Sequence, residues 1–278
     1  MVNPADSRAR VTRTCILLTC LLVSGAARAQ SGNPFNHRFS ISAAGYWPEI
    51  STTVRANGAG GLIGTSVNLE TDLGLDDRDT LFAGGLSWNI AHRHSLDLLY
   101  FELGRRGTKG ISHEINFQGH TFALQTSIQS LFETNVLRLS YGYAFLADDR
   151  QRLLAQIGVH YTKVKARLET DLGPFQTEAT SDVPLPVIGI AYERRLGEHF
   201  AFDVTGQLFR LEFDDLSGSL DNAALNFYWA PARRFSIYVG YNYYSINVDA
   251  RKQHWNGSFD FAYQGPWAGV VLGFGSTK

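Results

Sequence analysis

Residues 137–145 read LRLSYGYAF, and after a turn through Asp148, Asp149 and Arg150 the chain returns over residues 153–162 as LLAQIGVHYT. Apolar residues alternate with polar or small residues along both stretches. A period of two places successive side chains on opposite faces of a β-strand. The pair therefore predicts a β-hairpin with one apolar face. A soluble β-sandwich gives the same period, so alternation alone leaves the fold class open.

The first 29 residues differ from the rest of the chain. A basic stretch with Arg8, Arg10 and Arg13 precedes an apolar stretch, Ile16–Val23, which is shorter than the about twenty residues that a membrane-spanning helix needs. Small residues at positions 27 and 29 predict cleavage after Ala29. We expect a secretory signal peptide over residues 1–29 and one domain over residues 30–278.

The composition of residues 30–278 narrows the possible partners. The signal segment holds both cysteines, four of the 25 basic residues and one of the 26 acidic residues, so the remainder carries a net charge of −4. This balance argues against a nucleic-acid partner. The exported chain has no cysteine and therefore needs no disulfide framework.

The same alternation recurs in ten segments, each of which is a predicted strand. They are Arg38–Trp47, Thr80–Ile90, Ser95–Leu103, Asn135–Phe145, Arg152–Lys165, Val187–Arg194, Phe200–Leu211, Asn222–Trp229, Phe235–Val248 and Trp267–Gly275. Short polar connections (91–94, 146–151, 195–199 and 230–234) strictly alternate with longer ones. This order places all the short turns at one end of an antiparallel sheet, and we expect the prolines to fall at strand ends or in connections.

One face of these strands suits lipid. Phe235, Ile237, Val239, Tyr241 and Tyr243 share a face of one predicted strand, and the residues between them are polar or small. A transmembrane barrel turns such a face outward to lipid and the other face into a polar lumen. We therefore predict an all-β fold: an antiparallel up-and-down transmembrane β-barrel of about ten strands, with eight or twelve as alternatives.

The chain resembles a small bacterial outer-membrane β-barrel protein. The likeness rests on the signal, the short and long connections and a closing segment, GPWAGVVLGF at residues 265–274, that is similar to the final strand of such barrels. It implies a monomer in the bacterial outer membrane with both termini in the periplasm. It also implies lipid, lipopolysaccharide and the outer-membrane assembly machinery as partners.

Catalysis and cofactors have little support in the sequence. His94 and Ser95 are adjacent, but they lie in a predicted short turn at the periplasmic end and point to opposite faces. His113, Glu114 and His120 lie in a predicted outer connection without a matching serine. No metal-ligand spacing and no phosphate-binding glycine loop is present, so we expect no enzyme activity and no cofactor.

A short acidic segment occurs twice. Residues 69–74 read LETDLG, and the same six residues recur at 168–173. The simpler interpretation is a reused loop shape. The alternative is a divalent-cation site on the outer surface, with Glu70, Asp72, Glu169 and Asp171 as candidate ligands.

The polar face of the strands supplies the candidate lumen residues. These are Asp97, Arg138, His160, Glu193, Asp203 and Tyr238. A barrel of eight to ten strands is narrow enough for such side chains to fill it nearly completely. Two functions therefore stay open: a non-catalytic barrel with pore-like passage of small solutes or a structural role, and a surface-binding or adhesive barrel with a closed lumen. A lipid hydrolase of the outer membrane is a less favoured third.

Overall fold

The computed structural model describes residues 34–57, 64–110, 114–117, 120–122, 127–170, 176–213, 216–252 and 255–276. Within these ranges no helix is long and apolar enough to cross a membrane. The strands are β1 (Phe39–Tyr46), β2 (Glu49–Ala56), β3 (Val67–Asn68), β4 (Leu81–Ala91), β5 (His94–Gly110), β6 (Ile115–Phe117), β7 (His120–Phe122), β8 (Ser127–Ala147), β9 (Gln151–Thr170), β10 (Gln176–Arg195), β11 (Phe200–Phe213), β12 (Leu216–Ala232), β13 (Phe235–Lys252) and β14 (Trp255–Phe274).

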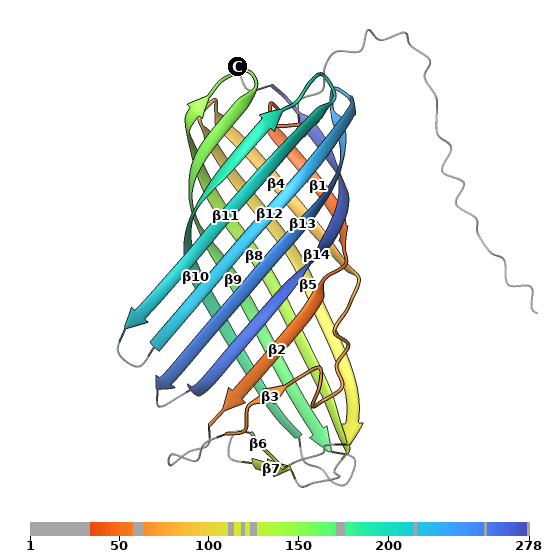
Figure 1. Cartoon of the computed structure of the whole chain (residues 1–278), viewed down its shortest axis with the longest axis vertical. Helices are drawn as coiled ribbons and strands as arrows, with labels where there is room; N and C mark the ends of the chain where they lie inside the picture. Colours follow the sequence, from red (N-terminus) through yellow and green to blue (C-terminus); the bar gives the residue numbers. More distant parts are fainter. Residues whose placement is uncertain are drawn as a thin grey trace, which may run out of the picture.

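Ten of these strands close into a barrel (Figure 1). The order around the ring is β1, β4, β5, then β8 to β14 in sequence, and every neighbouring pair is antiparallel. The pairing of β1 with β14, from Phe39 opposite Phe274 to Tyr46 opposite Trp267, closes the ring. The predicted ten-stranded up-and-down barrel is therefore confirmed. The predicted short connections gather at one end, beside the C-terminus, at the upper end of Figure 1.

Two further strands, β2 and β3, extend the sheet at the opposite end. Residues 257–264 of β14 pair with β2 instead of β1, and β3 pairs with the other edge of β2. At this fork the N–H of Trp47 donates to the carbonyl of Pro266 at 3.0 Å. A Cβ atom on Gly265 would lie 2.4 Å from the carbonyl oxygen of Trp47, so this close approach requires glycine.

Most strands are longer than the alternation predicts. β10 begins at Gln176 rather than Val187, and the connections between β11 and β12 and between β13 and β14 shrink to residues 214–215 and 253–254. Pro184 and Pro186 consequently lie inside β10, where we expected a connection. Over this stretch β10 pairs with β9 but not with β11, so it resembles an edge strand, which tolerates proline.

The alternation changes phase midway along the strands. On β13, Val239, Tyr241 and Tyr243 point outward and are exposed near the short turns, whereas Ile246 and Val248 further out point inward and are buried. The outward positions beside those two are polar. β9 repeats the change: exposed Ile157 and Tyr161 give way to exposed Lys163, and buried Val164 follows on the inner face.

This change of phase divides the barrel into two zones. The half near the short turns, the membrane half, is apolar outside and polar inside, as lipid requires. The other half, the outer half, is polar outside and apolar inside, as in a water-soluble protein. The barrel is therefore an outer-membrane β-barrel whose strands continue well beyond the lipid.

Candidate functional site

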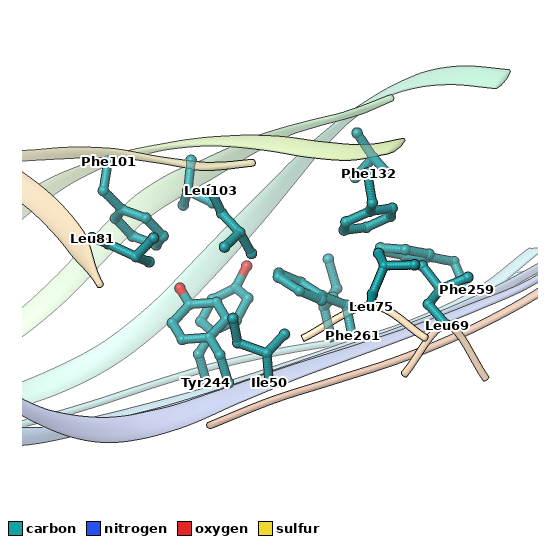
Figure 2. Close-up of a cluster of buried hydrophobic side chains, with 14 of the residues drawn as sticks. Ile50, Leu69, Leu75, Leu81, Phe101, Leu103, Phe132, Tyr244, Phe259 and Phe261 are labelled. Atoms are coloured by element: carbon teal, nitrogen blue, oxygen red, sulfur yellow. The ribbon is translucent and has the colours of Figure 1, made fainter. Parts of the chain in front are cut away.

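The lumen of the outer half is filled by a hydrophobic cluster. Figure 2 shows Phe101, Leu103 and Phe132 on one wall, facing Ile50, Tyr244, Phe259 and Phe261 on the other, with Leu69 and Leu75 between them. The rings are in contact: Tyr244 stacks on Tyr263 with 4.7 Å between centroids, and Phe132 lies 6.1 Å from Phe261.

Residues 64–80, here called the inserted segment, supply part of that cluster. Leu69, Leu73 and Leu75 are buried in it. β4 begins only at Leu81, so it does not extend along the outer part of β5. The inserted segment occupies the space between β2 and β5 there. A Cβ atom on Gly107 of β5 would lie 2.7 Å from the backbone of Gly74, which shows how closely the two chains approach.

A buried ion pair holds the inserted segment to the wall. The Arg105 guanidinium donates to the Glu70 carboxylate at 2.5 Å, and these side chains are 1% and 9% exposed. Arg105 also donates to the hydroxyl of Thr52 at 2.6 Å and to the carbonyl of Asp76 at 3.1 Å. These bonds connect β5, β2 and the inserted segment across the gap left by β4.

The membrane half contains a polar cavity of about 260 Å³. Four charged residues on four strands line it: Asp97 on β5, Arg138 on β8, Glu193 on β10 and Asp203 on β11. An adjoining cavity of about 170 Å³ shares Asp97 and Glu193 and reaches toward the short-turn end. Because these side chains point inward on alternate positions of paired strands, the lumen is the place where they meet.

Arg138 lies at the boundary between this cavity and the hydrophobic cluster. Its guanidinium donates to the side-chain oxygen of Asn222 at 3.0 Å and to the hydroxyl of Tyr263. It also lies 4.7 Å from the ring centroid of Tyr244, a cation–π distance. Its Nε atom has no hydrogen-bond partner. No described carboxylate forms a salt bridge with it.

The three carboxylates of the cavity have different partners. Glu193 forms a bidentate ion pair with Arg152, at 2.7 and 3.0 Å. Asp203 accepts hydrogen bonds from Asn226 and, at 2.6 Å, from the Tyr228 hydroxyl. Asp97 accepts from the Ser95 hydroxyl at 3.3 Å. Among the described ion pairs none joins Asp97 or Asp203 to a basic side chain.

The segment before β1 closes the short-turn end of the lumen. Phe35 packs edge-on against Tyr228 at 5.3 Å and lines both cavities. The Asn89 amide donates to the carbonyls of Phe35 and His37, at 3.1 and 2.7 Å. His37 is buried, and this burial lowers the pKa of its ring below the usual 6.5. The ring therefore stays neutral where a solvated histidine would start to protonate.

The other two predicted lumen residues also point inward. His160 is fully buried, accepts or donates one bond at 2.9 Å with Gln207, and stacks on Tyr244. Tyr238 lines the smaller cavity and packs against Tyr228. His160 thus belongs to the closed boundary layer with Arg138, while Tyr238 belongs to the cavity wall.

The acidic repeat is not brought together as one site among the described residues. Glu70 is committed to Arg105, and Asp72 accepts from the backbone N–H of Asn68 at 2.8 Å within its own turn. Glu169 is exposed on β9, and Asp171 lies outside the described residues. The described part of the chain contains no group of three or more acidic, histidine or cysteine side chains arranged to hold a metal ion.

Some cavity residues follow from strand phase and others do not. Tyr228 faces inward as alternation along its strand predicts, and the same phase could have found Asn226 on β12. Arg152 begins a predicted strand, and Phe35 precedes the first one. Nothing local predicts that Phe35 returns into the lumen.

Comparison with known proteins supports the fold. A family model described as "Protein of unknown function, DUF481" matches residues 100–254, more than half of the chain. The matched region contains Arg138, Glu193 and Asp203 but begins just after Asp97. No curated protein matches the chain at a significant level.

Several solved structures resemble this chain. The outer membrane protease OmpT from Escherichia coli has a TM-score of 0.56 and 12% identity, over 87% of this chain and 100% of that chain. The transport unit of the autotransporter AIDA-I from Escherichia coli has a TM-score of 0.43 and 9% identity, over 92% and 94%. OprG from Pseudomonas aeruginosa has a TM-score of 0.35 and 14% identity, over 87% and 98%. At these identities the likeness concerns the fold alone.

Proposed function

The chain belongs to the DUF481 family, and we propose that it is a non-conducting, non-catalytic outer-membrane barrel that holds a rigid surface-binding extension outside the membrane. The observation that carries this proposal is the hydrophobic cluster in the outer half of the lumen. Phe132, Tyr244 and Phe261 are each at most 1% exposed, so the cluster is packed like the core of a soluble domain. Passage of a hydrated solute would require this core to open.

The outer half supports the surface role. Its outward positions, such as Lys163 on β9 and Asn247 and Asp249 on β13, are exposed and polar. Its strands are hydrogen-bonded into the same sheet as the membrane half, so the extension is continuous with its anchor. Lipopolysaccharide and the polar components of the cell surface are the partners that this position offers, and we expect the protein to act as a monomer.

Two described histidines, His94 and His199, have non-acidic partners. His94 contacts the hydroxyl of Tyr141 at 2.6 Å, and His199 contacts the carbonyl of Ala230 at 3.0 Å. A general base in acyl or peptide hydrolysis is normally oriented by a carboxylate or amide beside the nucleophile. These contacts favour structural roles and support a non-catalytic barrel.

Conductance of the purified protein in a planar bilayer tests the proposal. We expect the wild-type barrel to be electrically silent, and Arg138→Ala to be silent as well, because the cluster lies outside Arg138. A steady wild-type conductance that changes in Arg138→Ala would instead establish a path through the lumen and refute the proposal.

A further inference from the structure

The charges that line the polar cavity are separated rather than paired. Arg138 is 7% exposed and has an unpartnered Nε, while Asp97 and Asp203 face the same space without a basic side chain in contact. Burial of a charge without a partner is costly unless something supplies the opposite charge. Arg152 does not do so, because both of its bonds to a carboxylate go to Glu193.

We propose that this cavity binds a small amino-carboxylate zwitterion, with its carboxylate toward Arg138 and its ammonium toward Asp97 and Asp203. Arginine has five N–H donors in a fixed fork geometry that matches a carboxylate, and the hydrogen bonds of Arg138 to Asn222 and Tyr263 use two of them. Asp97 and Asp203 supply two carboxyl groups to the same cavity. Tyr228 and Trp267, which also line the cavity, supply aromatic rings beside an ammonium group.

Size and charge narrow the ligand class further. The cavity of about 260 Å³ has the space of roughly nine water molecules at about 30 Å³ each, so it suits a ligand of about that many heavy atoms. With Glu193 paired to Arg152, one guanidinium faces two carboxyl groups, and ammonium groups of a ligand beside them would hold both in the ionised form. A ligand with two ammonium groups and one carboxylate balances this set, so a dibasic amino acid fits better than a neutral or an acidic one.

The ligand must enter from the periplasm. The hydrophobic cluster closes the outer end of the lumen, whereas the short-turn end is closed by Phe35 and by the hydrogen bonds that Asn89 makes to the carbonyls of Phe35 and His37. The segment before β1 is therefore the gate of the site.

Calorimetric titration of the folded barrel in detergent tests the inference with three probes. L-lysine has both kinds of group, 1,5-diaminopentane lacks the carboxylate, and hexanoate lacks the ammonium groups. We expect lysine to bind, and each of the other probes to bind at least about tenfold more weakly because one end of the cavity stays unpaired. Phe35→Ala should speed the association of lysine, because it removes the ring that closes the short-turn end of the cavity.

Three variants separate the two ends of the site. Asp203→Asn should weaken lysine and diaminopentane by roughly thirty-fold, whereas Arg138→Gln should weaken lysine and leave diaminopentane unchanged. Asp221→Asn, in an exposed ion pair with Arg210, is the matched control and should change neither. Folding of each variant is checked by the mobility shift of heated against unheated samples.

Two results would overturn the proposal. One is no heat of binding for lysine in the wild-type barrel at about 10 mM. The other is equal lysine binding by the wild-type barrel, Asp203→Asn and Arg138→Gln. Should the charge variants fail to fold, the probe comparison on the wild-type barrel and on Phe35→Ala still decides. The conductance test of the proposed function is independent of both results.

Discussion

The ion pair between Arg105 and Glu70 holds the inserted segment to β5 and β2. Removal of one partner of a buried ion pair leaves an uncompensated charge, which costs about 3–5 kcal/mol. We expect Glu70→Gln to lower the free energy of unfolding by about that amount, measured by urea titration in lipid vesicles. Asp221→Asn, which breaks an exposed pair with 56% and 42% exposed side chains, should cost less than about 1 kcal/mol. Equal losses in the two variants would contradict the role assigned to Glu70.

His37 makes the gate sensitive to acid. Burial lowers the pKa of its ring, and the charges of Arg233 and Arg234 add to this effect, while carbonyls of Gly275 and Arg233 act against it. The unfolded chain therefore binds a proton at a pH where the folded chain does not. The stability from the neutral ring is fully present above pH 6.5 and is lost as the pH falls through the lower folded-state pKa.

The measurement is the urea midpoint of the barrel at pH 8 and pH 5. We expect the wild-type midpoint to fall over this range by more than that of His37→Asn, which lacks the titrating ring. Other groups titrate in both proteins, so the difference between the two slopes is the quantity that reports on His37. Identical slopes would show that the ring protonates as freely in the folded barrel as in the unfolded chain.

At the scale of the strand, the change of alternation phase decides what a substitution does. Val239 and Asn247 lie on the same outward face of β13, and both are exposed. Val239→Arg places a charge in lipid and should cost about 2–4 kcal/mol near the bilayer centre, whereas Asn247→Arg should stay within about 0.5 kcal/mol. Folding titrations into vesicles measure both values. A large cost at Asn247 would place that residue in lipid as well.

The strands also show what the sequence can predict. Alternation, signal and turn spacing suffice for a ten-stranded barrel, because they follow from local chemistry on single strands. Some strand ends were wrong where the apolar face changes sides, as in β10, which begins at Gln176 rather than Val187. A pattern that expects one continuous lipid face assigns the inverted part of such a strand to a loop. The position of Arg138 in the lumen follows from its phase, but its missing counter-charge depends on strands far away in sequence.

For the whole molecule, we predict one orientation in the membrane. Short turns of outer-membrane barrels face the periplasm, so we expect the outer half to lie outside the cell. Neither cysteine lies after position 20, so single-cysteine variants have a clean background once the signal is removed. We expect a membrane-impermeant thiol reagent to label Asn247→Cys on intact cells and Asp149→Cys only after lysis. The reverse pattern would invert the barrel in the membrane.

The double partnership of β14 has a consequence for how the molecule assembles. Phe39 meets Phe274 and Thr52 meets Phe261, so both contacts join regions separated by almost the whole length of the chain. Contacts between regions so far apart in sequence form slowly, because closing the long loop costs conformational entropy before any contact stabilises it. Until then the nascent sheet has two unpaired edges, which is the state most prone to misassociation. Pairing of β14 with β1 and β2 then completes the ring and the hydrophobic cluster in one event. The step that makes folding slow therefore also makes unfolding of the finished barrel slow.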